Sequence, residues 1–168
     1  MTGREPSSTS RPSMPGYGTL PAEQGSGLLP WSWAVQQLTG SRNYWLATVG
    51  PDGQPHAMPV WGAWLDGALW FSSGGRSRKV RNLAHQPRCA LTTQDPEQPV
   101  QLQGLAEVVR DPTWIATFLD ASNLKYGTEI GIDFLDPDVN ATIRVPPRVV
   151  IALREADFTG SPTRWMFS

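Results

Sequence analysis

One run of residues in the middle of the chain combines glycines, serine hydroxyls and cations in a spacing suited to binding an anion. It reads Ser72-Ser73-Gly74-Gly75-Arg76-Ser77-Arg78-Lys79-Val80-Arg81-Asn82-Leu83. The glycines leave a predicted strand, and the cations fall in the first turns of a predicted helix, where positive charge opposes the helix dipole. A bound anion would offset that cost, because free amides, hydroxyls and guanidinium groups would all donate to it. The run therefore predicts a phosphate site; the alternative is a solvated basic helix face.

A second informative run, His56-Ala57-Met58-Pro59-Val60-Trp61, lies in a predicted strand. Pro59 cannot donate a hydrogen bond to a neighbouring strand, so this strand is expected at an edge, or where the backbone faces something other than a strand. A planar ligand could lie there. The alternative is an ordinary edge strand with Val60 and Trp61 in the core.

The familiar catalytic patterns are absent from the sequence. It has no nucleophile elbow, dinucleotide fingerprint, Walker loop or zinc-protease helix. His56 and His85 stand apart and Cys89 is the one cysteine, so we expect neither a metal site nor an internal disulfide. Cys89 is expected to be a buried, small apolar residue. No residue is therefore assigned a catalytic role.

The elements that must position these runs are short strands and three helices. Turns at Asp52-Gly53 and Asp66-Gly67 predict two hairpins. Strands are expected over 44–49, 56–65, 68–73, 89–93, 100–110 and 148–153, with a bend or bulge at Gly104. Helices are expected over 31–38, over 76–86, and from Pro112 onward with Asp111 as its N-cap. Because closure removes exposed strand edges, we predict a mainly β (α+β) fold, a six-stranded antiparallel barrel with short flanking helices.

Composition limits the class of protein. The chain has 168 residues, 14 Lys and Arg against 15 Asp and Glu, and a formal net charge of -1, so neither nucleic acid nor a membrane is an expected partner. Residues 1–30 are rich in Pro, Gly and Ser and are expected to form a flexible tail ahead of one domain at 31–168. No leader pattern or membrane-spanning stretch is apparent, so a cytoplasmic location is expected.

The same residues resemble the pyridoxamine 5'-phosphate oxidase-like superfamily of flavin and deazaflavin oxidoreductases. The resemblance covers roughly residues 31–158 and is specific as an ordered set. Its motifs are 44–49 (Tyr-Trp-Leu-Ala-Thr-Val), Asp52-Gly53-x-Pro55-His56, Pro59-Val60-Trp61, Phe71-Ser72, Arg78-Lys79-x-x-Asn82-Leu83 and Pro87-Arg88. The closing Thr163-Arg164-Trp165-x-Phe167 also resembles deazaflavin-type members.

The resemblance implies an FMN-binding-like split β-barrel homodimer with two cofactor sites at the subunit interface. It places Met58 to Trp61 along the cofactor ring, Phe71 and Ser72 beside it, and Arg78 and Lys79 on the phosphate. Asn82 would support the phosphate loop, and Gln101 would approach the cofactor from a neighbouring strand. The implied cofactor-binding residues are Met58, Pro59, Val60, Trp61, Phe71, Ser72, Arg78, Lys79, Asn82 and Gln101.

The resemblance also implies a function. The chain lacks the Arg-x-x-Pro type ending with which pyridoxamine phosphate oxidases bind substrate, so vitamin oxidation is not expected. We expect an oxidoreductase that binds coenzyme F-420, whose anionic tail Arg76 and Arg81 could receive, and that transfers hydride to a small organic acceptor. The alternatives are an FMN-dependent oxidoreductase and a non-enzymatic flavin or heme carrier.

Overall fold

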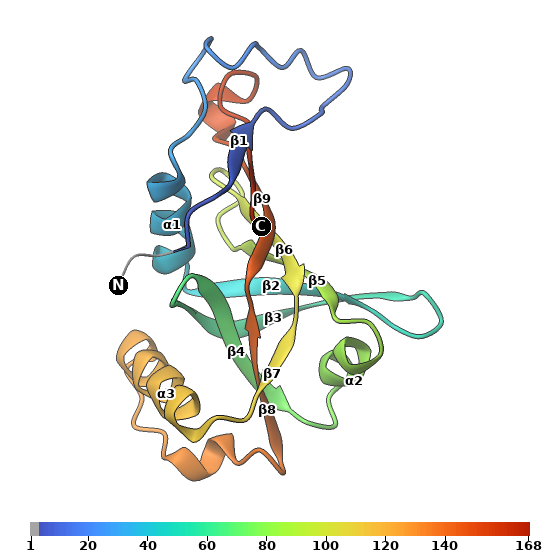
Figure 1. Cartoon of the computed structure of the whole chain (residues 1–168), viewed down its shortest axis with the longest axis vertical. Coiled ribbons are helices and arrows are strands. Elements are labelled where there is room, and N and C mark those ends of the chain that lie inside the picture. Colours follow the sequence, from blue (N-terminus) through green and yellow to red (C-terminus); the bar gives the residue numbers. More distant parts are fainter. Residues whose placement is uncertain (1–3) are drawn as a thin grey trace.

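The computed structural model describes residues 4–168, in which one curled antiparallel sheet forms a half-barrel with three helices packed against it (Figure 1). The helices are α1 (Trp31–Gly40), α2 (Arg78–His85) and α3 (Pro112–Tyr126), with short 3-10 turns at Ile132–Leu135 and Glu155–Asp157. The strands are β1 (Ser8–Ser10), β2 (Asn43–Val49), β3 (Pro55–Leu65), β4 (Ala68–Gly74), β5 (Arg88–Thr93), β6 (Val100–Leu105), β7 (Glu107–Val109), β8 (Asn140–Val145), β9 (Pro147–Ala152) and β10 (Thr163–Met166).

The sheet order is β1-β10-β9-β6-β5-β2-β3-β4-β8-β7. The mainly β class, the three helices and the two hairpins are confirmed. Gly53 and the pair Asp66 and Gly67 have positive φ, as the Asp-Gly turns predict. The β2–β3 hairpin protrudes beyond its neighbours, and its tip is the teal loop at the right of Figure 1.

The predicted number of six strands is wrong, because the described residues form ten. The predicted strand over 100–110 divides into β6 and β7 at Ala106. The other additions, β1, β8 and β10, are short or lie beside Pro and polar residues, so their sequences lack a clear alternation of apolar and polar positions. Their strand geometry comes from pairing with longer neighbours, which residue pattern alone does not reveal.

Two bent strands curl the sheet. β6 and β7 are joined only by Ala106, and β8 and β9 only by Pro146. β6 pairs with β9, and β7 pairs with β8, so β6–β7 and β8–β9 lie side by side as two long bent strands. Because β9 and β8 are far apart in the strand order, this pair of bent strands brings the two ends of the sheet together. The register shifts between Gln103 and Gly104, which confirms the predicted bulge at Gly104.

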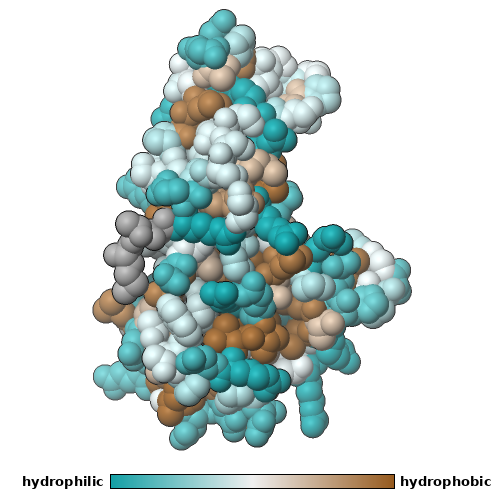
Figure 2. Space-filling view, viewed as in Figure 1, coloured by the Kyte–Doolittle hydropathy of each residue, from teal (hydrophilic) through white to brown (hydrophobic). Residues whose placement is uncertain are grey.

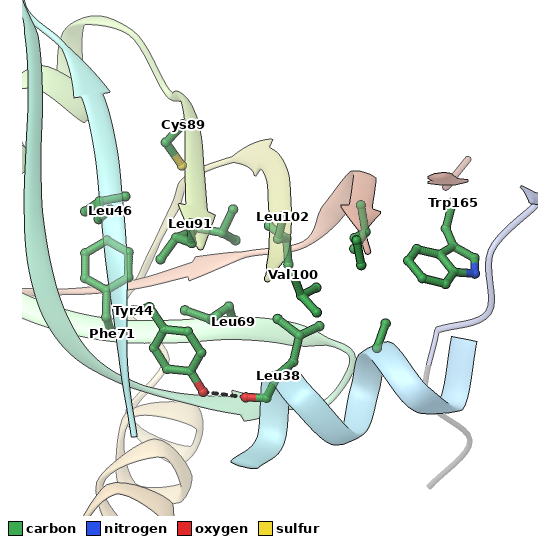
Figure 3. Packing of buried hydrophobic residues seen from close by; sticks show 14 of the residues in the cluster. Leu38, Tyr44, Leu46, Leu69, Phe71, Cys89, Leu91, Val100, Leu102 and Trp165 are labelled. Carbon is green, nitrogen blue, oxygen red and sulfur yellow. Dashed lines mark hydrogen bonds between the residues drawn. The ribbon is translucent and has the colours of Figure 1, made fainter. Parts of the chain in front are cut away.

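The interior of the half-barrel is filled by side chains. Tyr44, Leu46, Leu69, Phe71 and Leu91 are among the fully buried residues, and Figure 3 shows them above α1. The Tyr44 hydroxyl donates to the Leu38 carbonyl of α1 over 2.5 Å (Figure 3). A ligand must therefore bind at a rim or on the outside of this sheet rather than within it.

A second apolar cluster lies between α3 and the sheet. Trp70 of β4 packs against Ile115 and Phe118 of α3. The predicted N-cap is confirmed, because the Asp111 carboxylate accepts from the backbone N–H of Thr113 over 2.8 Å. α3 is thus held rigidly on the outside of β3 and β4, and it ends beside the start of β2.

Residues 4–30, part of the segment expected to be a tail, lie against the sheet. Ser8–Ser10 pair with β10, and the Arg11 guanidinium donates to five backbone carbonyls, among them those of Pro162 and Gly160, each over 2.7 Å. Residues 1–3 of the predicted tail lie outside the described residues, and the flexibility of the segment stays a prediction. Among residues 4–168, no helix has the length and apolar character that crossing a membrane requires.

Candidate functional site

The first half of β3 has a free edge. Residues 55–61 pair with β2 on one side, whereas pairing with β4 on the other side begins only at Gly62. Pro59 lies within this stretch, so the prediction that its strand would be an edge there is confirmed. Met58 and Trp61 are about half exposed, at 46% and 53%, while Val60 is buried in the core. The backbone and two large side chains are therefore open to a planar ligand here.

The end of β4 lies next along the chain and contributes hydroxyl groups. The Ser72 hydroxyl oxygen is buried and has no hydrogen-bond partner among the described residues. An unpaired buried hydroxyl carries a free-energy cost that a ligand bond would remove. Phe71 is fully buried in the core, so its side chain presents no surface to a ligand.

The basic run forms the turn after β4 and the start of α2. Ser77 caps the helix by accepting from the backbone N–H of Val80 over 3.4 Å, and its hydroxyl lies 3.1 Å from that of Ser73. The Lys79 ammonium donates to the Ser73 hydroxyl over 3.4 Å and so folds back toward the helix N-terminus. The amide of Gly75 donates to Val139, which fixes the turn.

The cations of α2 have no acidic partners. Within residues 4–168 the one ion pair is Arg144–Glu107, which joins β8 to β7 and involves no residue of α2. Arg78 and Arg81 border a groove of about 550 Å³ between α2 and the turn of the β2–β3 hairpin. The structure therefore separates the three cations in the first turns of α2: Lys79 turns toward Ser73, and Arg78 and Arg81 line the groove.

Asn82 attaches α2 to the sheet. Its side chain is buried, and its amide donates to the Thr48 hydroxyl over 3.0 Å. This bond joins the basic helix to β2 and fixes the groove relative to the free edge of β3. The bond from Asn82 to Thr48 is the kind of contact that supporting the phosphate loop would require.

Gln101 is not brought to this site within one chain. It lies on β6, and β5 and β2 separate β6 from β3, a distance of about 14 Å at ordinary strand spacing. Its side chain accepts from that of Gln103 over 2.8 Å.

The side of β2, β3 and β5 that faces away from the barrel interior is apolar and is called here the outer sheet face. It carries Trp45, Ala47, Val49, Ala57 and Ala90, which alternate with buried residues. Trp45 is 50% exposed and Val49 40%. Figure 2 shows apolar surface beside the base of the protruding hairpin. Exposed aromatic and aliphatic residues gathered in this way are typical of a contact surface.

A cluster at the end of α3 was not predicted. Lys125 donates through Nζ to the Gly62 carbonyl over 2.7 Å and to the Tyr44 hydroxyl over 3.0 Å. Burial, together with the nearby Arg42, lowers the pKa of Lys125 to about 8. Tyr126 stacks on Trp61 with ring centroids 4.2 Å apart. The sequence contains no signal for this cluster, because Lys125 and Tyr126 lie more than sixty residues along the chain from Trp61 and Gly62.

Two further pKa values reflect burial alone or nearly so. Burial raises the pKa of the Cys89 thiol to about 12, which fits the expected small apolar residue and leaves little thiolate for chemistry. Burial also raises the pKa of the Tyr44 hydroxyl, with a smaller contribution from Tyr126. Neither group is suited to proton transfer near neutral pH.

The fold and the site now define a class: an antiparallel half-barrel with a cationic helix beside a free strand edge. The family model for pyridoxamine 5'-phosphate oxidase matches residues 34–159. The chain belongs to this family, whose members are generally oxidoreductases.

Solved structures agree. An F-420 reductase is 30% identical, with a TM-score of 0.57, over 68% of this chain and 94% of that chain. A conserved hypothetical protein from Mycobacterium tuberculosis is 26% identical, with a TM-score of 0.66, over 77% of this chain and 87% of that one. General stress protein 26 from Bacillus anthracis shares the fold at 20% identity, with a TM-score of 0.60, over 74% and 94% of the two chains. None of the curated proteins matches this sequence.

Proposed function

We propose that this protein is an oxidoreductase that binds coenzyme F-420 and transfers hydride to a small organic acceptor. The observation that carries the proposal is the basic start of α2, whose cations form no ion pair within residues 4–168 and follow directly on the end of β4 with its orphaned Ser72 hydroxyl. These groups fit a phosphate attached to a planar ring. The reduced cofactor, when bound, supplies the hydride.

Each group has a distinct task in this proposal. Arg78 and Lys79 bind the phosphate, and Ser72 donates its free hydroxyl proton to it or to the adjoining part of the cofactor. The backbone of residues 58–61 lies along the ring, with the side chains of Met58 and Trp61 on opposite faces of the strand. Asn82 keeps α2 in place, and the chain's task is to bind and orient the cofactor while keeping water from the ring.

The choice of F-420 over FMN rests on two observations. The groove beside the phosphate position carries two arginines, Arg78 and Arg81, against one carboxylate, Asp52, and an anionic tail beyond the phosphate would balance the remaining positive charge. The F-420 reductase is also 30% identical to this chain. FMN would satisfy the Ser72, Arg78 and Lys79 groups equally well but would leave the Arg81 end of the groove unused.

We further propose a homodimer in which the outer sheet face meets a second copy. Gln101 lies on the same side of the sheet as Trp45, because both residues pair in register with Thr92 of β5, one from each side. In such a dimer, Gln101 of one chain would approach the cofactor held by β3 and α2 of the other. One interface would then complete two sites.

Titration of the purified protein with F-420, followed by cofactor fluorescence, tests the function. Replacing Arg78→Ala and Lys79→Ala together should weaken binding at least a hundredfold, since charge-assisted hydrogen bonds to phosphate each contribute about 1.5–3 kcal/mol. Arg110→Ala, which removes an exposed arginine outside the groove, is the matched control and should bind like the wild type.

The outcomes separate the alternatives. A yellow purified protein that binds FMN and not F-420 would favour the FMN-dependent enzyme. Tight cofactor binding without reduction of any tested enone or quinone would favour a carrier. Unchanged affinity in the double variant would remove the phosphate assignment.

A further inference from the structure

The hydrogen-bond ladder between β2 and β3 ends in an unusual way. The register runs as far as the pair Asn43 and Trp61. At the next position, the Tyr126 hydroxyl accepts from the Gly62 N–H over 2.8 Å and donates to the Arg42 carbonyl over 2.5 Å. A side-chain hydroxyl from α3 thus stands where a direct bond between the two strands would otherwise form.

Lys125 holds the other backbone group of the same glycine. Its Nζ donates to the Gly62 carbonyl over 2.7 Å and to the Tyr44 hydroxyl over 3.0 Å. The Arg42 guanidinium lies 5.4 Å from the centroid of the Tyr126 ring, and Lys125 Nζ lies 5.4 Å from it as well. Both polar groups of Gly62 are therefore fixed by the last two residues of α3.

Trp61 is held by the same helix. Its ring stacks on that of Tyr126 with an interplanar angle of 8°, and its own residue is 53% exposed. Trp61 is also the last residue of the free edge of β3, immediately before pairing with β4 begins at Gly62. α3 is anchored on Trp70 through Ile115 and Phe118, so Tyr126 provides a rigid support for an otherwise exposed indole.

We propose that Tyr126, supported by Lys125, is a positioning residue that holds Trp61 and the end of the free edge in the geometry that receives the cofactor ring. This inference rests on the proposed function, because the ring is the ligand named there. Tyr126 acts through Trp61, and its contribution is to order that side chain before the ligand arrives. Ordering one large side chain in advance changes ligand affinity by up to roughly tenfold.

A double-mutant cycle on F-420 affinity tests the coupling. Tyr126→Leu removes both ring and hydroxyl and should weaken binding about tenfold. Tyr126→Phe keeps the stacked ring and loses only the bridging hydroxyl, so it should restore most of the affinity, to within about threefold of wild type. In a Trp61→Ala background, either Tyr126 substitution should cause no further loss. Tyr17→Leu is the matched control, because Tyr17 also packs on an aromatic ring, Phe158, away from the site.

A second readout needs no cofactor. In protein labelled with 5-fluorotryptophan, the fluorine resonance of Trp61 is identified by its loss in Trp61→Phe. It should shift or broaden in Tyr126→Leu, change less in Tyr126→Phe, and stay unchanged in Tyr17→Leu. If the Leu variant does not fold, Tyr126→Met and Lys125→Met carry the test: the first removes the stacked ring and the second removes one support of Gly62, and each should shift the Trp61 resonance.

The two readouts distinguish the possible failures. Wild-type protein that binds neither F-420 nor FMN would refute the proposed function, while the fluorine resonance would still test the positioning. An unmoved Trp61 resonance in the Tyr126 variants would overturn the inference. Additive losses of affinity in the Trp61→Ala background would overturn it as well, because Tyr126 would then not act through Trp61.

Discussion

Lys125 keeps its amino group in a partly buried position where neighbouring groups are aromatic, neutral or positive. Tyr44, Tyr126 and the Gly62 carbonyl surround Nζ, Arg42 lies nearby, and no carboxylate pairs with it among residues 4–168. Burial first, and Arg42 second, lower its pKa to about 8. The charged form is thus the disfavoured one in the folded protein, whereas the unfolded chain keeps an ordinary lysine.

This difference has a definite sign in the pH dependence of stability. Between about pH 8 and 10.5 the unfolded chain binds more protons at Lys125 than the folded chain does, so Lys125 contributes a rise with pH to the free energy of unfolding. Cys89, whose pKa is raised in the folded chain, contributes a fall as its thiol titrates in the unfolded chain, and this fall is common to the wild type and the Lys125 variant. Lys125→Met removes the rise. Urea unfolding at several pH values from 7 to 9.5 would measure it, because this range lies below the ordinary titration of Tyr44 and Tyr126. Parallel pH curves for the two proteins would contradict the assignment.

Some residues of the candidate site can be predicted from one short stretch of sequence, and others are found only from the folded structure. The cations and Ser72 are recognisable from sequence because they lie together in one run, and Pro59 marks the free edge by what its backbone lacks. Tyr126 and Lys125 could not be found that way. Their contacts with Gly62 span 64 and 63 residues and depend on how α3 packs against the sheet.

At the scale of elements, the bend between β6 and β7 decides how the sheet curls. At Gly104 the register shifts, and a Cβ there would lie 2.3 Å from the Pro146 carbonyl oxygen and 2.7 Å from Val145 Cγ1. At Gly104 the bent strand β6–β7 therefore lies closer to the bent strand β8–β9 than a residue with a side chain would allow. Sequence predicts the bend from this glycine, but not the strand β8 that lies against it.

Gly104→Ala should consequently destabilise the fold, since the added methyl must displace backbone atoms of the neighbouring bent strand. We expect a loss of about 1–3 kcal/mol in the free energy of unfolding, measured by urea denaturation. Gly40→Ala is the matched control, because a Cβ at Gly40 meets nothing within 4 Å and this residue ends α1. Its stability should stay the same or rise slightly. Equal stability of the two variants would contradict this prediction, because it would mean that the two bent strands can move apart at little cost in free energy.

At the scale of the whole molecule, the residues of the proposed site do not all meet within one chain. In the proposal, β3 and α2 supply the phosphate position and one side of the ring site, whereas Gln101 lies on β6 and the apolar outer sheet face is exposed. These facts are reconciled if a second copy covers that face, which is the proposed homodimer. The sequence of β2 indicates which of its positions alternate between exposed and buried. It does not show that Ala47, Ala57 and Ala90 form one apolar surface, because that depends on the pairing of β2 with β3 and β5.

Ala47→Glu tests this arrangement, because Ala47 lies exposed at the centre of the outer sheet face between Ala57 and Ala90. A carboxylate there is hydrated in the free chain but must lose water in the dimer, with Arg88 and Arg148 lining the same pocket, so dimer affinity should fall at least tenfold. Sedimentation equilibrium should then report one chain of 18.4 kDa where the wild type reports twice that mass. Ala116→Glu, an exposed alanine on α3, should leave the dimer unchanged.

The same variant also connects assembly to cofactor binding. A monomeric Ala47→Glu protein keeps Arg78 and Lys79 but loses the partner surface that carries Gln101, so F-420 should bind more weakly than to the wild type and more tightly than to the Arg78→Ala, Lys79→Ala variant. Titration by cofactor fluorescence below the dimer dissociation constant of the variant would show this order. A monomer that binds F-420 with full affinity would mean that each chain holds its cofactor alone, and the outer sheet face would then need another explanation.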